Sequence, residues 1–465
     1  MPDAEIKLNL AAEFPPTPTA EWEDVIAKDL KGADYEKKLV WRTEEGFSVR
    51  PYYRRENLAG LEGQLALRRT KSGWEISEQF APAADAVRAD LLHEGGATAI
   101  QELGYGIAEG VEKLAALSEK KPVEEAAGEM EFVFAAGPSY FNEIAKLRAA
   151  RLLWAQVAAA FGAKSPVAMK IAVRTPRRNK SVFDHNTNLL RATTEALSAV
   201  LGGCDALYVE PFGFDRHIAV NIQRILQEES HLDAVADPAG GSYYIESLTD
   251  AIAREAWKLF QGVEAEGGFT KAKESGSIGK AIEAARAARE KSLTSRRKAL
   301  VGVNNFPNLM ETAADIQDVQ PPKAECEHEY RVATPFEAIR RRTLDFAKAK
   351  GKAPKVLLLT RGDVKMKGAR SNFALNFFGC AGFAIETSEE YAGSDADLIV
   401  LCSSDPEYLA FAKDVCPKVK VPVIVAGNPK DQIEALEAAG VKGFIHVQSD
   451  AAATLADWQN KLGME

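Results

Sequence analysis

Five short apolar runs alternate with four helical patterns over residues 351–465, and this alternation constrains the fold more than any other feature of the chain. Apolar runs of this length, bounded by turn signals, are typical of buried strands. Parallel strands need a crossover between them, usually a helix, so the alternation predicts a doubly wound parallel sheet. We expect its strands at residues 356–359, 383–386, 398–402, 423–426 and 443–447, with helices near 368–380, 405–415, 429–439 and 449–462.

The segment 61–310 shows the same alternation over a longer stretch. A (β/α)8 barrel typically has about 250 residues, which is the size of this segment. The pattern contains too few strands for eight, so either some strands are cryptic or the barrel is incomplete. The predicted strands are 65–69, 74–80, 131–135, 167–174 and 206–210, and the predicted helices lie near 97–117, 139–162, 186–201, 216–230, 246–264 and 277–299.

The whole chain is therefore expected to be an α/β protein with four parts. Residues 1–60 form an N-terminal arm, 61–310 a partial (β/α) barrel, 311–350 a linker with a basic helix at 336–350, and 351–465 a flavodoxin-like domain. The arm is broken early by prolines and contains a short amphipathic helix at 22–30. It either lies across the surface of another protein or packs as a cap on its own domain.

Composition excludes several classes of function. The net charge of -9 is spread along the chain, which argues against nucleic-acid binding. The five cysteines contain no C-x-x-C pair, so we expect free thiols in a reducing compartment. The six histidines show no metal-binding spacing, and we predict no metal site. With no apolar run long enough to cross a bilayer and no signal pattern, we expect no membrane contact and a cytoplasmic location.

Four ordered segments carry a family resemblance. They are Tyr140–Ala155, which contains F-N-E-I-A-K-L-R, Leu226–Tyr243, which contains Q-E-E-S and D-P-A-G-G-S-Y, His93–Leu103, and Val301–Asn304. In this order they resemble the methylmalonyl-CoA mutase family, over roughly residues 20–310 and 350–460. The resemblance implies a substrate barrel and a corrinoid domain, and an adenosylcobalamin-dependent radical rearrangement of acyl-CoA thioesters.

In the family, the first strand-to-helix loop of the corrinoid domain reads D-x-H-x-x-G, and its histidine ligates cobalt. The corresponding loop here is Asp363–Gly368, in which Lys365 takes the place of the ligand. A lysine ammonium has three donors and no lone pair. There are two alternatives to the loss of cobalt binding: a neutral Lys365 ligates cobalt, or the corrinoid binds without a lower protein ligand. The remaining family positions are also altered, which implies a degenerate corrinoid pocket made of Asp363, Lys365, Gly368, Cys402, Ser404 and Gly427.

The catalytic positions that the resemblance implies are altered as well. Leu91 stands where active subunits carry the catalytic histidine, and no tyrosine occurs between Tyr53 and Tyr105. Only about fifteen residues separate the predicted strand 74–80, which corresponds to the first barrel strand of the family, from the His93 segment, where the family has several βα units. We therefore predict no catalytic residue in this chain, and sheet edges that a partner subunit or the arm must cover.

Arg148 and Arg151 are candidates for pairing with CoA phosphates, and solvated surface charge is the alternative for both. Together these features predict a non-catalytic small subunit of a heterodimeric mutase of this family. Its partner would be a homologous large catalytic subunit that binds the adenosylcobalamin, and this chain would contact acyl-CoA at most. The alternatives are an active acyl-CoA mutase of altered specificity and a stand-alone acyl-CoA-binding module.

Overall fold

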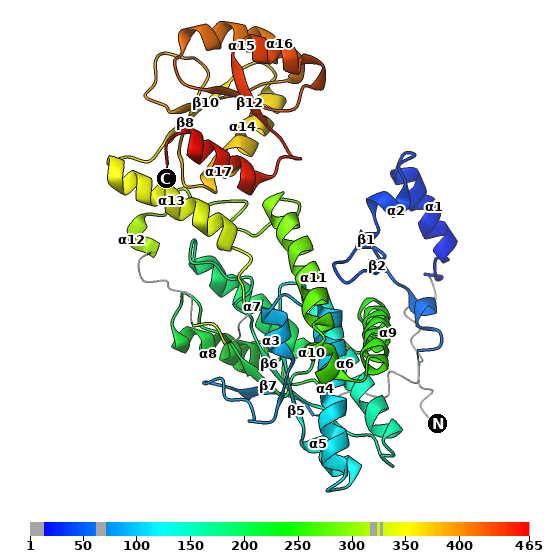
Figure 1. The fold of residues 1–465 in the computed structure, drawn as a ribbon. Helices are drawn as coiled ribbons and strands as arrows, with labels where there is room; N and C mark the ends of the chain where they lie inside the picture. Colours follow the sequence, from blue (N-terminus) through cyan, green and yellow to red (C-terminus); the bar gives the residue numbers. More distant parts are fainter. Residues whose placement is uncertain (1–13, 62–70, 317–322, 326–328, 465) are drawn as a thin grey trace, which may run out of the picture.

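The computed structural model describes residues 14–61, 71–316, 323–325 and 329–464. It contains two five-stranded parallel sheets, one in the middle of the chain and one at its C-terminal end. Figure 1 shows the second sheet and its helices above the first, with the N-terminal arm standing to one side. The α/β fold class is thus confirmed, and each sheet has its own hydrophobic core.

The first sheet has the strand order β3-β7-β6-β5-β4, with every pair parallel. Its strands are β3 (Glu75–Ile76), β4 (Val87–Arg88), β5 (Glu131–Ala135), β6 (Lys170–Arg174) and β7 (Ala206–Tyr208). The first strand of this sheet pairs with the last, Ile76 against Leu207, as in a closed barrel. β3 and β4 are nevertheless its two open edges, because no described strand bridges them.

This arrangement matches an incomplete barrel, since the strands that would follow β3 in a (β/α)8 barrel lack counterparts in the described residues. Three predicted strands are present but shorter at one or both ends, and β5 has the predicted bounds. β4 was missed because two residues give no periodicity. The strand predicted at residues 65–69 lies outside the described residues.

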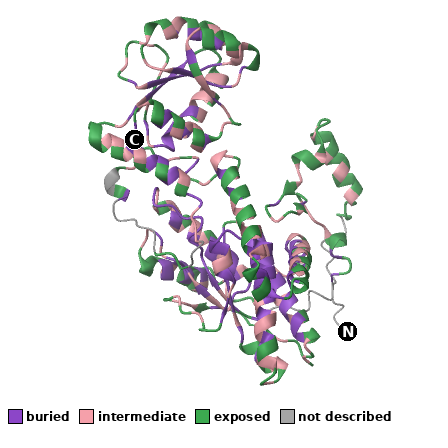
Figure 2. Ribbon diagram, in the orientation of Figure 1, coloured by how far each residue is buried: buried purple, intermediate pink, exposed green. Residues whose placement is uncertain are grey.

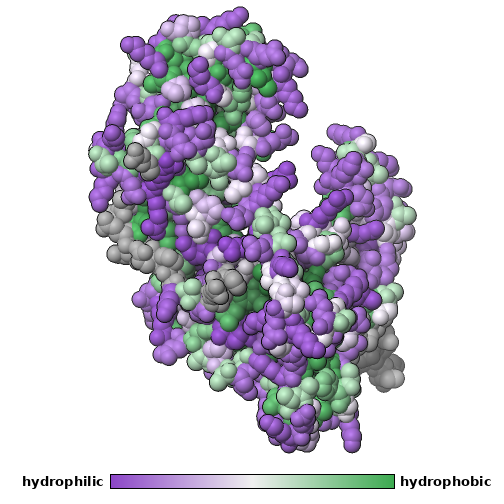
Figure 3. Space-filling model, in the orientation of Figure 1, coloured by the Kyte–Doolittle hydropathy of each residue, from purple (hydrophilic) through white to green (hydrophobic). Residues whose placement is uncertain are grey.

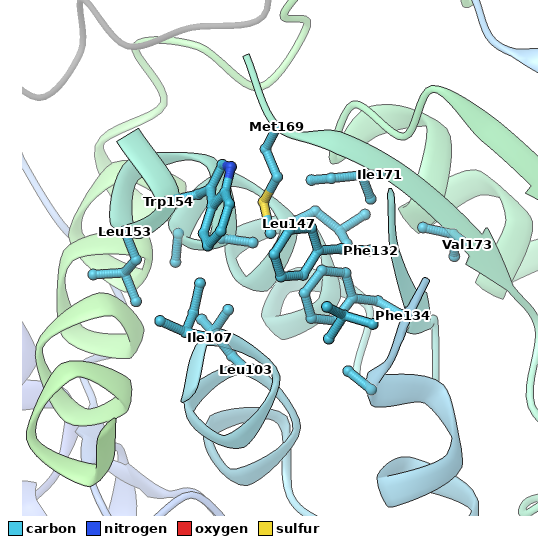
Figure 4. Packing of buried hydrophobic residues seen from close by; sticks show 14 of the residues in the cluster. Leu103, Ile107, Phe132, Phe134, Leu147, Leu153, Trp154, Met169, Ile171 and Val173 are labelled. Carbon is cyan, nitrogen blue, oxygen red and sulfur yellow. The ribbon is translucent and has the colours of Figure 1, made fainter. Parts of the chain in front are cut away.

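Helices α4 (Ala99–Ser118), α6 (Tyr140–Ala160) and α9 (Tyr243–Ala265) form the main contacts of the first core. Phe132 and Phe134 on β5 point toward them, and Phe132 lies edge-on to Trp154 at 4.7 Å between ring centroids (Figure 4). Gly110 on α4 permits this approach, because a Cβ there would lie 2.7 Å from the Phe132 ring. The core therefore depends on a glycine that lets a helix approach an aromatic strand closely.

The opposite face of the first sheet carries polar side chains. Arg88, Arg174 and Tyr208 alternate along their strands with residues of the core, so they face the other way. The connection between β3 and β4 crosses this face and places the Phe80 ring 4.9 Å from the Arg88 guanidinium and 4.6 Å from that of Arg174. Phe80 also packs against Tyr208, at 5.4 Å between centroids. A short aromatic connection thus covers the side that would face the interior of a barrel.

The second sheet has the order β12-β11-β10-β8-β9, also all parallel, which is the flavodoxin-like order. Its strands are β8 (Lys355–Thr360), β9 (Ala384–Ser388), β10 (Leu398–Cys402), β11 (Val423–Ala426) and β12 (Val441–Ile445). Helices α14 (Val364–Gly379), α15 (Tyr408–Val415), α16 (Ile433–Ala438) and α17 (Ala451–Lys461) connect or follow them. All five predicted strands and four predicted helices of this domain are confirmed; β10 and β11 have the predicted bounds, and the other elements have shifted ends.

One shift changes the interpretation of the candidate corrinoid loop. The prediction that residues 363–368 form a loop is wrong, because α14 begins at Val364. The Asp363 side chain accepts a hydrogen bond from the Met366 N–H at 2.8 Å and caps the helix there. Lys365 therefore belongs to the first helical turn.

The N-terminal arm consists of α1 (Thr19–Asp29), α2 (Tyr35–Lys38) and a hairpin of β1 (Trp41–Arg42) and β2 (Ser48–Val49). The hairpin turn packs on the first domain, where Glu45 accepts hydrogen bonds from Ala99 and Ile100 at the start of α4. α1 has no buried residue, and Trp22 and Val25 are exposed. Figure 2 shows the arm mainly in the colours of exposed and intermediate residues. The turn acts as a cap on its own domain, whereas α1 leaves an apolar side uncovered.

The remaining elements connect these parts. They are η1 (Arg55–Leu58), α3 (Ala89–Glu94), α5 (Val123–Glu129), α7 (Asn186–Leu201), α8 (Arg216–Arg224), the π-helical η3 (Ile225–Glu229), α10 (Phe269–Glu274), α11 (Ser277–Thr294), α12 (Ala313–Ile316), α13 (Thr334–Lys350), and the short turns η4 (Asp405–Glu407), η5 (Cys416–Lys418) and η6 (Lys430–Gln432). Within the described ranges, no helix has both the length and the apolar character needed to span a membrane.

Candidate functional site

Ligands of doubly wound sheets bind at the carboxyl ends of the strands, where the strand order reverses. In the second sheet this reversal lies between β8 and β10, which are direct neighbours. The chain segments that border it are Arg361–Asp363 after β8 and Ser403–Glu407 after β10. These two segments contain Asp363 and Ser404, and Cys402 directly precedes the second segment.

The side chain of Glu407 occupies the space between these two segments. Its Oε2 accepts hydrogen bonds from the hydroxyls of Ser403 at 2.7 Å and Ser404 at 2.6 Å. The hydrogen bonds from Ser404 and Ser403 lower the pKa of Glu407, so its carboxyl group is ionised at neutral pH. Gly362 has φ +82, and a Cβ there would lie 2.0 Å from Glu407 Oε2. The crevice is thus filled by a carboxylate that belongs to the chain.

A second side chain closes the neighbouring position at the end of β11. The Tyr408 hydroxyl donates to the Ala426 carbonyl at 2.6 Å and accepts from the Ser403 N–H at 3.1 Å. Gly427 is buried beside it, and a Cβ on Gly427 would lie 3.1 Å from the tyrosine ring. Burial raises the pKa of the nearby Cys402 to about 12, so this thiol stays protonated. Ser404, Cys402 and Gly427 therefore take part in internal packing.

The two remaining predicted residues lie on α14. Lys365 is exposed to solvent, and no described atom lies within 4 Å of a Cβ built on Gly368. Gly368 is thus not required by a close backbone approach, which is the reason for a glycine at that position in the family motif. Of the six predicted residues, the structure gathers Ser404, Cys402 and Gly427 with Asp363 around the Glu407 crevice and leaves Lys365 and Gly368 on the helix.

These residues do not fit a corrinoid. An exposed ammonium cannot replace an imidazole ligand to cobalt, because it has no lone pair to donate. The crevice also contains Glu407 and Tyr408. The Ser403 hydroxyl is shared between the Glu407 carboxylate and the Arg361 carbonyl after β8, and the Tyr408 hydroxyl donates to Ala426 at the end of β11. Over the part of the chain that the structure describes, no group of three or more His, Cys, Asp or Glu side chains could hold a metal ion.

A buried polar cluster lies near the carboxyl ends of the first sheet. Lys146 on α6 donates to Glu102 Oε2 at 2.7 Å and to the Ala135 carbonyl at 2.6 Å. His93 Nδ1 lies 2.9 Å from the same Glu102 oxygen. Burial, together with the charges of Arg178 and Lys146, holds the pKa of His93 well below its usual range, so the ring is neutral. Leu91 lies two residues earlier on α3, and its side chain has no polar atom.

Sequence reasoning missed this cluster. The sequence feature that could have indicated it is the pair Glu143 and Lys146 among the apolar residues of α6. Both side chains are buried, and charged residues are rarely buried unless they are paired. A second cluster that it missed joins Arg174 to Asp90, Glu94 and Glu210 at the ends of β4, β6 and β7. Its signal was an arginine directly after the apolar run of β6.

The two candidate CoA-binding arginines make ion pairs within the chain. Arg148 bonds to Asp237 and, at 2.6 Å, to Glu246, which fastens the D-P-A-G-G-S-Y segment to α6 and α9. Arg151 bonds to Asp205 at 2.9 Å and to the Gly203 carbonyl at 2.6 Å. Arg151 also lines a cavity of about 1010 Å³ at the amino ends of the first sheet, together with Lys170. Both charges are compensated internally, and a role in CoA binding stays a prediction.

The fold and these clusters define a two-domain α/β protein with an open sheet of barrel type and a flavodoxin-like domain whose ligand crevice is filled. A model of methylmalonyl-CoA mutase matches residues 75–344. The chain belongs to the methylmalonyl-CoA mutase family.

Three relatives show how the chain compares with this family. It is 32% identical over 622 positions to the methylmalonyl-CoA mutase small subunit of Porphyromonas gingivalis, covering 99% of this chain and 100% of the relative. It is 37% identical to the small subunit of Streptomyces virginiae, over 82% of this chain and 65% of that protein. A probable small subunit of Mycobacterium tuberculosis is 36% identical, over 70% of this chain and 55% of that protein.

The lengths of these alignments bear on the open sheet. The first alignment has 622 positions and the chain has 465 residues, so well over a hundred positions of that relative have no counterpart here. The chain spans less than two thirds of the second and third relatives. A family barrel without several of its βα units agrees with the unbridged edges at β3 and β4.

Proposed function

We propose that this chain is the non-catalytic small subunit of a heterodimeric methylmalonyl-CoA mutase, which converts methylmalonyl-CoA to succinyl-CoA. The observation that carries the proposal is the crevice of the second sheet, where Glu407 occupies the ligand position and Lys365 replaces the cobalt ligand. The small-subunit names of the relatives support it. The large partner would bind the adenosylcobalamin and contain the whole active site.

The arm and the open sheet indicate where the partner would bind. α1 presents Trp22 and Val25 to solvent, at 43% and 57% exposure, and buries none of its residues. Figure 3 shows the arm set apart from the second domain on this face, with a notch between them. The Trp22 ring contacts Tyr52 and Arg54 within the arm but stays partly exposed. An amphipathic helix that its own chain covers only in part is a frequent anchor for a partner subunit. We place the partner contact on α1 and at the β3 and β4 edges.

The remaining assignments are proposals of the same kind. We divide the chain into an arm at 1–60, a partial barrel at 61–310, a linker at 311–350 and a degenerate corrinoid-type domain at 351–465. Acyl-CoA, if it contacts this chain, would enter the cavity that Arg151 and Lys170 line. The cytoplasm is the proposed location, because the described cysteines are free thiols.

Co-expression with a tagged large subunit tests the proposal. We expect the two chains to elute together, mutase activity to require the large subunit, and cobalt to be present at one atom per heterodimer. A variant of the large subunit without its cobalt-ligating histidine should contain no cobalt and have no activity, although the complex still forms. Activity of this chain alone, or failure of the two chains to associate, would overturn the proposal.

A further inference from the structure

Three arginines converge on one point at the carboxyl edge of the first sheet. Arg88 ends β4, Arg174 ends β6, and Arg177 follows β6 by three residues. Arg174 is fully buried and Arg177 is 8% exposed, so neither charge is dispersed into bulk solvent. Buried arginines are rare unless anions compensate them, and the carboxyl edge of a parallel sheet is where α/β proteins place ligand-binding groups.

Carboxylates of the first domain hold the three guanidinium groups in place. Asp90 accepts from Nε and Nη2 of Arg88, both at 2.8 Å. Glu210 contacts Arg174 and Arg177, each at 3.1 Å. These bonds use one side of each guanidinium and leave further N–H groups of the three arginines directed at a common point. The geometry of the arginines is thus fixed before any other group arrives.

The group at this common point comes from the linker between the two domains. Glu325 Oε2 lies 2.6 Å from Arg174 and 3.4 Å from Arg88, and its Oε1 lies 3.0 Å from Arg177. One carboxylate oxygen therefore contacts Arg174 and Arg88 and the other contacts Arg177, as in recognition of a bound carboxylate ligand. Glu325 is 30% exposed at its side chain, so it lies at the mouth of the site and not within the core.

A cavity adjoins this position. It has a volume of about 490 Å³ and includes Arg177, Ala324 and Glu329 in its lining. The Nε atoms of Arg174 and Arg177 are buried without a hydrogen-bond partner in the described structure. A ligand whose carboxylate replaced that of Glu325 would have room for the rest of its atoms in this cavity.

We propose that Arg88, Arg174 and Arg177 form a binding site for a small free carboxylate, and that Glu325 is its resident internal ligand. An internal group tethered by a short chain competes at an effective concentration of about millimolar, so external ligands bind weakly while Glu325 is in place. Binding of an external carboxylate displaces Glu325 and releases the linker at this point. The site would thereby couple a small metabolite to the connection between the domains. This inference uses only residues of this chain and does not depend on the proposed subunit role.

Chemical rescue of a Glu325→Ala variant tests the site. The thermal midpoints of the full-length wild type and variant are measured in sodium acetate, disodium succinate and sodium chloride, at equal ionic strength. We expect the variant to be stabilised by acetate or succinate in a saturable way and not by chloride, with an apparent Kd at least tenfold lower than that of the wild type. Arg88→Ala in the same background should abolish the response.

A matched control separates a built site from any lost ion pair. Asp414 pairs with one arginine, the exposed Arg361, at 2.8 Å and also with Lys418 in the second domain, so Asp414→Ala likewise removes one carboxylate from an arginine. We expect no carboxylate-specific stabilisation of this control. An equal response to chloride and acetate in the Glu325 variant, or an equal response of both variants to acetate, would overturn the proposal. If Glu325→Ala does not fold, Glu325→Gln keeps the linker shape and is judged by the same criteria.

Discussion

Replacing Glu94 by glutamine tests the electrostatics of the first sheet quantitatively. Glu94 is buried, and its two carboxylate oxygens accept the backbone N–H groups of Arg177 and Arg178 at 2.8 and 3.0 Å. Burial raises the pKa of Glu94 from 4.5 to about 7, against the lowering effect of Arg174 and the backbone bond from Arg177. The folded state therefore holds this proton more tightly than the unfolded state does.

The sign of the pH effect follows from this difference. Where the folded state binds more protons, the free energy of unfolding falls as pH rises. The contribution of Glu94 is fully present below the unfolded pKa of 4.5 and is lost as pH rises to about 7. Between pH 5 and pH 8 these two pKa values correspond to a loss of about 2.5 kcal/mol. Glutamine does not titrate, so the variant should lack this part of the pH dependence.

Urea unfolding of both proteins from pH 5 to pH 8 measures the effect. Other groups titrate in both proteins, so the relevant quantity is the difference between the two free energies of unfolding at each pH. Glutamine places an amide N–H against one backbone donor, and this clash adds a pH-independent destabilisation of about 1–3 kcal/mol. We expect the disadvantage of the variant to shrink by about 2.5 kcal/mol between pH 5 and pH 8. A difference that is constant with pH, or that grows, would refute the reasoning.

Three further predictions concern the filled crevice, the core and the arm. Lys365→His should not produce cobalamin binding in a UV–visible titration, because Glu407 still fills the crevice; a spectral shift at micromolar cobalamin would contradict this account. Phe132→Ala should lower the free energy of unfolding in urea by about 3–5 kcal/mol, since the ring is fully buried against Trp154; a loss below about 1 kcal/mol would contradict the packing described. Trp22→Ala should leave the thermal midpoint of the isolated chain within a degree or two, since no residue of α1 is buried and the contacts of Trp22 with Tyr52 and Arg54 lie within the arm, but weaken association with the large subunit in a pull-down; unchanged association would remove α1 from the interface.

The second domain could be predicted from the sequence almost completely. Its strands are apolar along their whole length because helices cover both faces of the sheet, as Val400 and Leu401 illustrate with zero exposure on adjacent positions. The first sheet was harder, because its edge strands β3 and β4 have only two residues each. The pairing of β3 with β7 joins segments more than a hundred residues apart and leaves no local signal.

The candidate site was predicted in its residues but not in its geometry. Lys365 and Asp363 were found from the motif, whereas the early start of α14 was not, although Asp363 is a good helix cap. Glu407 was missed although Ser404 and Glu407 form a capping box, whose S-x-x-E spacing is visible in the sequence; only the close approach of Glu407 to Gly362 depends on the folded sheet. Glu325 lies 151 residues from Arg174, and such long-range charge pairing cannot be read from spacing.

The corrinoid content of the separated subunits tests the central claim most directly. The complex is reconstituted with adenosylcobalamin and separated under mild denaturing conditions, and the cobalt in each chain is then quantified by mass spectrometry and by absorbance. The account predicts all of the cobalt with the large subunit and none with this chain, at free cofactor concentrations up to about millimolar. A Kd of that size is already weak for a cofactor. Stoichiometric cobalt bound to this chain would contradict it.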